Sequence, residues 1–198
     1  MEEQALVAAT QKGDHDAFNQ LVIHYQNLAY HVAYRIVSDA DAAADATQDA
    51  FLRAYRAINQ YRGGSFKAWL LRIVTNTCYD QLRAKKRRPT ASLEALLVTD
   101  PTPGSSFVDQ AESPETYAER QELSRIIQAG INALPSDQRT VLALCDVAGM
   151  SYQEIAEVTQ ASLGTVKSRI HRARTKLRDY LLAQQELLPA QYRLRSDT

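Results

Sequence analysis

Six lysine and arginine side chains stand between positions 167 and 178, in a segment whose apolar residues repeat at helical spacing. Val166, Ile170, Ala173 and Leu177 occupy positions i, i+4, i+7 and i+11, which places them on one inward stripe of a helix. Cations on the other faces of such a helix can reach phosphates and guanine edges in the major groove of DNA. A solvated basic face on an ordinary helical bundle is the alternative interpretation of the same charges.

The residues before this helix favour DNA binding, because they predict a helix-turn-helix. An apolar segment of helical spacing, residues 134–148, is broken at Gly149. Ser151, with Glu154 three residues later, predicts a capping box that begins a short second helix. Ser162 then stands where it can cap the cationic helix. The close spacing of the two helices is typical of a DNA-binding module.

A second surface is predicted on a helix over residues 41–59. Asp45, Gln48, Asp49 and Leu52 lie at i, i+3, i+4 and i+7, and so share one acidic, polar face with a single apolar residue. Such a face suits a basic partner surface. The residue types alone favour a simpler interpretation, a solvated helix face.

A third set of residues lies on a helix predicted over 66–84. Phe66, Trp69, Leu70 and Ile73, with Thr77, trace its core stripe, so Trp69 is interpreted as a packing residue. The opposite side offers polar, aromatic and cationic groups, namely Lys67, Arg72, Thr75, Asn76, Tyr79 and Arg83.

This helix stands between a glycine loop that carries Tyr61 and Arg62 and a basic run from Lys85 to Arg88. Aromatic and cationic groups together suit single-stranded nucleic acid, because its bases can stack on the aromatic rings and its phosphates can pair with the cations. A basic helix end terminated by Pro89 accounts equally well for the charges. At the level of the residues, both interpretations stay open.

The elements that must position these residues are helices throughout. We expect an all-α chain of two small domains, over residues 1–88 and 119–182, joined by a flexible acidic linker over 89–118 and followed by a tail over 183–198. The C-terminal domain is expected to be a helix-turn-helix of four helices, similar to a winged helix. The net charge is zero, yet cations and acids are segregated along the chain, and local patches decide which partners are attracted.

Several classes of function are not supported by the sequence. Cys78 and Cys145 lack metal or disulfide spacing and are expected to be reduced. The four histidines form no cluster, and no phosphate-binding glycine loop is evident, so we expect neither a metal, a cofactor nor catalysis. There is no signal-peptide pattern and no apolar run of about 20 residues, so we expect a cytoplasmic protein without membrane insertion.

Two blocks of the chain together resemble the extracytoplasmic-function group of sigma-70 factors. They read ATQDAFLRAYRAINQYRGGSFKAWLLRIVTNTCYDQLR (residues 46–83) and LPSDQRTVLALCDVAGMSYQEIAEVTQASLGTVKSRIHRARTKL (residues 134–177). The resemblance implies an alternative sigma factor that binds RNA polymerase core, melts the promoter −10 element and reads the −35 element. Its implied partners are the clamp of the β′ subunit, the flap of the β subunit, promoter DNA and an anti-sigma factor.

The resemblance also assigns the residues above to partners. Polymerase binding falls to Asp45, Gln48, Asp49 and Leu52. Binding of the −10 element falls to Tyr61, Arg62, Arg72, Asn76, Arg83, Lys85, Lys86 and Arg87. Binding of the −35 element falls to Thr165, Lys167, Ser168, Arg169, His171 and Arg172. The loop at Gly63-Gly64 is one residue shorter than the family's commoner form, which leaves its base preference open.

Two alternative functions compete with this assignment. A DNA-binding regulator that never contacts polymerase would explain the block over 134–182 but leave the block over 41–88 without a purpose. A nuclease or recombinase would need catalytic groups that the sequence does not offer.

Overall fold

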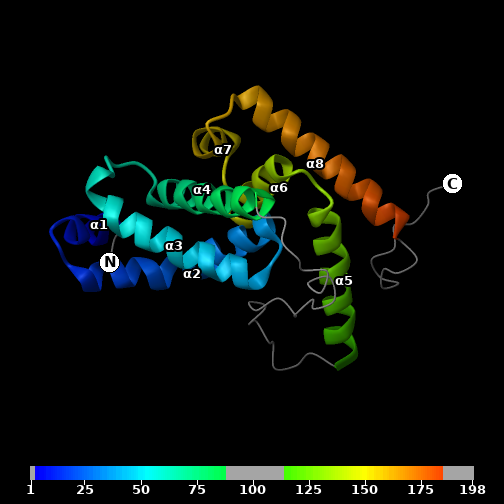
Figure 1. Cartoon of the computed structure of the whole chain (residues 1–198), viewed down its shortest axis with the longest axis horizontal. Coiled ribbons are helices and arrows are strands. Elements are labelled where there is room, and N and C mark those ends of the chain that lie inside the picture. The colour runs from blue at the N-terminus through cyan, green and yellow to red at the C-terminus, as the bar shows by residue number, and fades with distance from the viewer. Residues whose placement is uncertain (1–2, 88–113, 185–198) are drawn as a thin grey trace.

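The computed structural model describes residues 3–87 and 114–184, and these residues form helices with no strand among them (Figure 1). The N-terminal module contains α1 (Glu3–Gln11), α2 (His15–Val37), α3 (Ala40–Ala57), the 3-10 turn η1 (Ile58–Gln60) and α4 (Phe66–Arg87). The C-terminal module contains α5 (Pro114–Asn132), α6 (Ser136–Leu142), the π-helix η3 (Ala143–Val147), α7 (Tyr152–Thr159) and α8 (Leu163–Ala183). The expected linker and tail lie largely outside the described residues.

Small side chains bring the three long helices of the N-terminal module together. In α3 the alanines Ala43, Ala46, Ala50 and Ala54 are fully buried, and they face α2 and α4. Asp14 and Asp39 cap α2 and α3 by accepting hydrogen bonds from backbone N–H groups in the first turn. Ser38, between α2 and α3, takes the left-handed conformation at φ 62° and reverses the chain.

The C-terminal module follows the expected helix-turn-helix. Ile155 of α7 and Val166, Ile170 and Ala173 of α8 are buried, as the helical spacing predicted. Gly149, at φ 62°, ends the segment before α7, in the conformation that glycine adopts without steric cost. The last helical positions before it form a π-helix instead of a regular turn, and Val147 there is 36% exposed instead of buried.

The two modules pack against each other through α2 and α4 on one side and α5, α6, η3 and α7 on the other (Figure 1). We call this contact the junction. Among the described residues, polar bonds cross it from Tyr79 to Thr140 (2.9 Å), Arg139 to Ser38 (2.8 Å), Lys67 to the carbonyl oxygen of Ala148 (3.2 Å), and Arg35 to Gln128. One apolar cluster runs through both modules, so the junction is a packed interface.

Burial at the junction changes the titration of its polar groups. Desolvation lowers the pKa of the Arg35 and Arg139 guanidinium groups, because burial penalises their charged forms. Desolvation likewise raises the pKa of the Tyr79 hydroxyl, which keeps this group protonated and able to donate to Thr140. The junction therefore contains cations that are removed from water.

Several expected boundaries shift in the structure. The helix expected over 41–59 ends as a helix at Ala57 and continues as the 3-10 turn η1. The helix expected to end at residue 84 continues to Arg87, so the basic run is helical. Helical order was expected to resume near residue 118, whereas α5 begins at Pro114.

Gly130 of α5 offers a test of the packing between α5 and α8. A Cβ atom at Gly130 would lie 2.7 Å from Leu177 Cδ1 and 2.7 Å from Tyr180 Cδ1. We expect Gly130→Val to lower the free energy of unfolding by about 2 kcal/mol, because overpacking forces the neighbours to move. Urea unfolding of the full chain measures this.

Gly164→Val is the matched control, because the nearest atom to a Cβ there is Ser162 Oγ at 3.9 Å. Its effect should stay within about 0.5 kcal/mol. If both variants lowered the free energy of unfolding by the same amount, the close contact between α5 and α8 would not be the reason that glycine is required at position 130.

Candidate functional site

The α3 face consists of Asp45, Gln48, Asp49 and Leu52, and all four side chains are exposed. The buried alanines of α3 occupy the opposite side, which fixes this face outward. Leu52 is 49% exposed, so this face presents one large apolar side chain beside two carboxylates. The structure thus brings the four predicted residues together on one accessible surface.

An apolar groove of about 580 Å³ borders the α3 face. Phe18 and Val22 from α2 and Phe51 and Tyr55 from α3 line it, and Leu52 lies at its edge. The Phe18 ring packs against those of Tyr55 and Phe51, with centroids 4.9 Å and 6.5 Å apart. A hydrogen bond of 2.8 Å between Tyr55 and His15 joins the two helices at one end.

The sequence analysis missed the α2 half of this surface. His15, Asn19, Val22 and Gln26 line the groove, and Ile23 beside them on α2 is 68% exposed. Ile23 was the available signal, because it falls outside the buried stripe of Leu21, Tyr25, Ala29 and Val32. Exposed apolar residues that lie together with an apolar groove, as Ile23 and Leu52 do, indicate a surface that has a partner.

The α4 face is the exposed stripe of Arg72, Asn76 and Arg83, continued by Lys85, Lys86 and Arg87 at the helix end. All six were predicted as nucleic-acid contacts, and the structure places every one of them in solvent. Lys85, Lys86 and Arg87 occupy the last turn of α4, where their charges also interact favourably with the negative end of the helix dipole.

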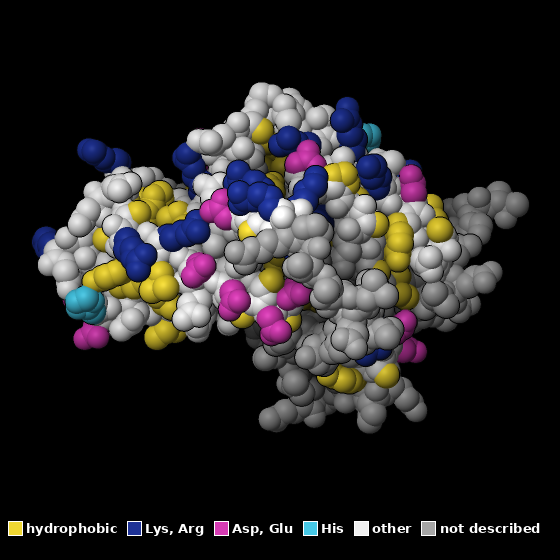
Figure 2. Space-filling view, viewed as in Figure 1, with side chains coloured by type: hydrophobic (Ala, Val, Ile, Leu, Met, Phe, Trp, Pro, Cys, Tyr) yellow, Lys and Arg dark blue, Asp and Glu magenta, His cyan; other side chains and the backbone are white. Residues whose placement is uncertain are grey.

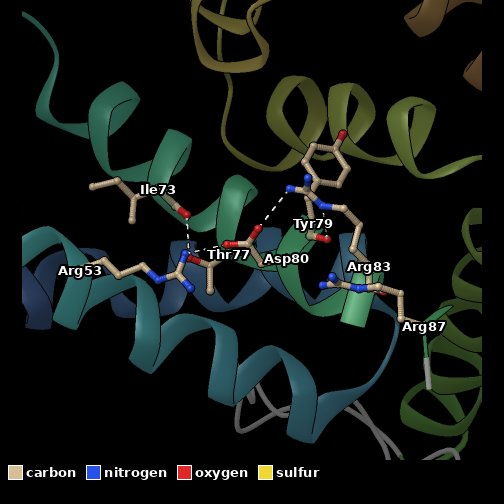
Figure 3. A network of polar contacts seen from close by, with 7 residues as sticks. All are labelled: Arg53, Ile73, Thr77, Tyr79, Asp80, Arg83 and Arg87. Carbon is tan, nitrogen blue, oxygen red and sulfur yellow. Dashed lines mark hydrogen bonds and ion pairs between the residues drawn. The ribbon is translucent and has the colours of Figure 1, made fainter. Parts of the chain in front are cut away.

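Asp80 of α4 links this face to α3 through ion pairs (Figure 3). Its carboxylate accepts from Arg53 Nη1 at 2.8 Å and from Arg83 Nη2 at 3.1 Å. The Arg83 Nε donates to the carbonyl oxygen of Tyr79, and Arg87 Nε donates to that of Arg83. Arg83 is therefore held along the helix, whereas Arg72 and Asn76 project from it without a bond in this network.

Part of the predicted α4 surface faces protein instead of solvent. Thr75 is 1% exposed, so its assignment to the polar face was wrong. Tyr79 and Lys67 bond across the junction to Thr140 and Ala148, and Figure 3 shows the Tyr79 ring pointing away from Asp80 toward the C-terminal module. Trp69 and Ile73, expected in the core, are only partly buried.

The loop before α4 is held in one conformation by its own bonds. The Tyr61 hydroxyl donates to the carbonyl oxygen of Gly64 at 2.6 Å, and Gln11 donates to that of Tyr61 at 3.1 Å. Gly63 and Gly64 have φ of 100° and 91°, which other residues rarely adopt. The Tyr61 ring lies edge-on to Trp69, at 5.5 Å, and Arg62 is exposed.

The recognition helix α8 presents most of its predicted contacts to solvent. Its first turn is capped by Ser162, which accepts from the backbone N–H of Thr165 at 3.1 Å. Lys167, Ser168, His171 and Arg172 are exposed. Thr165 is half-buried, with its hydroxyl 2.8 Å from that of Ser162, so it supports the cap.

Arg169 departs from the predicted set. Its guanidinium forms an ion pair of 2.9 Å with Asp137 of α6, and its side chain is 30% exposed. Since successive residues of an α-helix are rotated by about 100°, Arg169 points roughly 160° away from Lys167. The two cannot contact the same base edges.

The capping box at the start of α7 gives a pH-dependent prediction. The Glu154 carboxylate accepts from the Ser151 backbone N–H and hydroxyl, both at 2.8 Å, and these bonds lower its pKa from the ordinary 4.5. A lowered folded-state pKa stabilises at neutral pH and ceases to do so as the carboxylate is protonated below 4.5. We expect Ser151→Ala to cost about 1 kcal/mol at neutral pH and less at about pH 3.

Urea unfolding at the two pH values measures this difference. Ser162→Ala is the control, because Ser162 is also a helix cap but Thr165 occupies the place of the glutamate. Its cost should not change with pH. A Ser151→Ala cost that is equally independent of pH would contradict the assigned role of Glu154.

On the N-terminal module, cations and acids gather in partly separate areas. Figure 2 shows Lys and Arg side chains over the middle of this face, where α4 lies, and acidic side chains below them along α3. No helix among the described residues has both the length and the apolarity to cross a lipid bilayer. In the same part of the chain, no three His, Cys, Asp or Glu side chains are placed to share a metal ion.

Comparison with known proteins relates both modules to one family. Residues 21–88 match the family described as Sigma-70 region 2, and residues 124–177 match Sigma-70, region 4. The chain is 41% identical over 174 residues to the RNA polymerase sigma-H factor of Pseudomonas aeruginosa, covering 87% of this chain and 90% of that protein. It is 39% identical over 173 residues to the ECF RNA polymerase sigma-E factor of Escherichia coli K12, with the same coverage.

Two solved structures share the arrangement of the helices. CnrH, in complex with the cytosolic domain of CnrY, aligns with a TM-score of 0.67 and 28% identity, over 91% of this chain and 97% of that one. The sigma factor RpoE from Bartonella quintana, in complex with the anti-sigma factor NepR, aligns with a TM-score of 0.65 and 27% identity, over 83% and 96%.

Proposed function

The chain belongs to the extracytoplasmic-function group of the sigma-70 family, and from this premise we propose how its surfaces divide the work of an alternative sigma factor that directs promoter-specific transcription. We assign region 2 to residues 1–88, a linker to 89–118, region 4 to 119–182 and a tail to 183–198. Sigma factors are initiation factors, and we propose no catalytic activity for this one.

The α3 face and its groove bind RNA polymerase core, at the clamp of the β′ subunit. Leu52, Phe51 and Val22 supply apolar contact area, and Asp45 and Asp49 supply charge at its rim. This composition, an apolar centre with a polar and charged rim, is the usual anatomy of a protein interface. The single observation that carries the proposal is the exposure of Leu52 beside an apolar groove.

The α4 face and the loop at Tyr61 open the −10 element. Arg72 and Asn76 are exposed and available to a separated strand, and Lys85, Lys86 and Arg87 can follow its phosphates. The loop offers Arg62 and the partly buried rings of Tyr61 and Trp69 next to that strand. The exposed residues of α8, Lys167, Ser168, His171 and Arg172, read the −35 element as duplex, while Arg169 and Thr165 support the helix.

The related solved structures support further protein partners in addition to the clamp of the β′ subunit. Both structural neighbours were solved with a protein partner, in one case an anti-sigma factor. We propose that an anti-sigma factor binds this chain as well, that the flap of the β subunit contacts region 4, and that the protein acts in the cytoplasm, where polymerase and DNA are.

Run-off transcription tests the proposal. Purified chain is added to core polymerase with genomic DNA, and the transcript start sites are mapped. We expect initiation at a small set of sites that share two sequence elements. Core polymerase alone is the control. If the chain gives no specific start sites although it is folded, the proposed function is wrong.

A further inference from the structure

Gln11, the last residue of α1, bonds to the start of the loop that precedes α4. Its side-chain Nε2 donates to the carbonyl oxygen of Ile58 at 3.0 Å and to that of Tyr61 at 3.1 Å. An amide nitrogen carries two hydrogens, so both bonds can form at once. Ile58 and Tyr61 stand 47 and 50 positions from Gln11 along the chain, and α1 packs beside η1 (Figure 1). One amide therefore fastens the first residue of the loop to the first helix of the module.

The docking of α1 depends on other residues. Leu6 and Val7 are buried in the apolar core, and the Thr10 hydroxyl bonds within α1 to the carbonyl oxygen of Leu6 at 2.8 Å. Gln11, by contrast, is exposed. Substitution of an exposed side chain away from the core has a small effect on stability. The two bonds of Gln11 therefore act on the loop more than on the fold.

Tyr61, the residue that Gln11 holds by its backbone, is also held by its side chain. The Tyr61 hydroxyl donates to the carbonyl oxygen of Gly64 at 2.6 Å. The ring lies edge-on to the rings of Phe66 and Trp69, with centroids 5.9 Å and 5.5 Å away. Phe66 is fully buried, so the ring of Tyr61 rests on a fixed part of α4. Backbone, hydroxyl and ring together set the position of Tyr61.

The other end of the loop is fixed by α4. The Ser65 hydroxyl accepts from the backbone N–H of Ala68 at 3.2 Å, as a helix cap does. Between the two fixed ends stand Arg62, Gly63 and Gly64, all exposed. The two glycines take positive φ, and glycine has more accessible conformations than any other residue. Bonds at both ends limit this freedom, so release of one end would let the loop take several conformations.

From this arrangement we propose that Gln11 is a positioning residue for recognition of the −10 element. It holds Tyr61, and through it Arg62, in the place where the loop receives the separated strand. A loop that is already ordered binds without the entropic cost of ordering. Its fixed shape also discriminates between bases, so a loosened loop loses base preference as well as affinity. This inference rests on the proposed function, which assigns the loop to the −10 element.

Gln11→Glu tests the amide at nearly constant size. The carboxylate cannot donate a hydrogen bond, and it faces two carbonyl oxygens, so both bonds are lost. Holoenzyme made from core polymerase and the full chain is given copies of a mapped promoter that carry each of the four bases at each −10 position. Permanganate reactivity of unpaired thymines outside the element measures opening.

Two effects are expected of Gln11→Glu. Open complexes at the preferred sequence should decrease about tenfold, because two hydrogen bonds that order the loop are missing. At a −10 position that contacts the loop, the ratio of opening between the best and the worst base should fall by about threefold or more. Affinity for core polymerase should stay at the wild-type value, because the α3 face is unchanged.

Three further variants make the result specific. Gln4→Glu is the matched control, because Gln4 is exposed, lies seven residues earlier on the same face of α1 and receives the same change of charge. Its opening and base preference should match those of the wild type. Gln11→Lys keeps a long side chain with a donor and should retain most of the base preference. Tyr61→Phe removes the bond to Gly64 and should reduce the preference at the same −10 position as Gln11→Glu.

Three outcomes would overturn the proposal. In the first, wild-type holoenzyme discriminates between bases and Gln11→Glu does so equally well, which leaves the proposed function intact. In the second, Gln11→Glu lowers the urea midpoint of unfolding and the affinity for core polymerase while its base preference stays wild-type, which would mean a purely structural role. In the third, wild-type holoenzyme opens no promoter, and then the proposed function fails as well.

Discussion

Leu52→Glu is expected to weaken binding of the chain to core polymerase by about a hundredfold or more. Leu52 is 49% exposed at the edge of the apolar groove and becomes buried only when a partner covers it. The variant removes an apolar contact near the centre of the proposed interface and places an unpaired carboxylate there, and each change costs on the order of 2 kcal/mol or more. Surface-immobilised core polymerase and titrated chain give the dissociation constant.

Leu182→Glu is the matched control. Leu182 of α8 is 39% exposed, so the same substitution is made at a similar exposure but outside the α3 face and its groove, where the clamp is proposed to bind. Both variants should unfold at wild-type urea concentrations, because neither residue is in the core. Wild-type affinity of Leu52→Glu for polymerase would place the interface elsewhere on the molecule.

The second large effect is expected at the α4 face. Arg72→Ala combined with Asn76→Ala should reduce the formation of open promoter complexes by about a hundredfold. Each side chain is exposed, and each contact with the separated strand is worth about 1–2 kcal/mol. Permanganate reactivity of unpaired thymines at the mapped promoter measures opening. Polymerase binding should remain unchanged, since the α3 face is intact.

The control for this pair uses the same residue types elsewhere. Arg125→Ala with Asn59→Ala removes an exposed arginine from α5 and an exposed asparagine from η1, outside the α3 face, the α4 face and the exposed contacts of α8. Open complexes should form normally with this variant. If the α4 pair variant opened the promoter as well as this control does, the −10 assignment of α4 would be wrong.

Local signals in the sequence predicted the parts of the structure that short segments determine. The capping box of Ser151 and Glu154 and the cap at Ser162 are present as expected, because a cap is formed by residues three apart. The buried stripe of α8 followed from helical spacing alone.

The failures have one physical cause, contact between distant segments. Tyr79 was predicted on a polar face of α4, but its hydroxyl bonds to Thr140 of α6, 61 positions away along the chain. Arg169 pairs with Asp137 of α6, a contact that helical spacing does not indicate. The groove was not predicted because half of its lining residues come from α2, and Val22 of α2 lies beside α3 only in the folded module.

The junction has a consequence for when this protein can occupy a promoter. Tyr79 of α4 and Arg169 of α8 bond to Thr140 and Asp137, one turn apart on α6, a helix only about 10 Å long. Two elements centred about 25 base pairs apart are separated by roughly 85 Å of B-form DNA. If α4 binds the −10 element and α8 the −35 element, as proposed, the folded free chain can engage one element at most, and the modules must separate before both are bound. Any fraction of molecules in which the modules stay packed together would lower the apparent affinity for promoters in proportion, so the free chain would compete less well than the assembled enzyme for its own start sites.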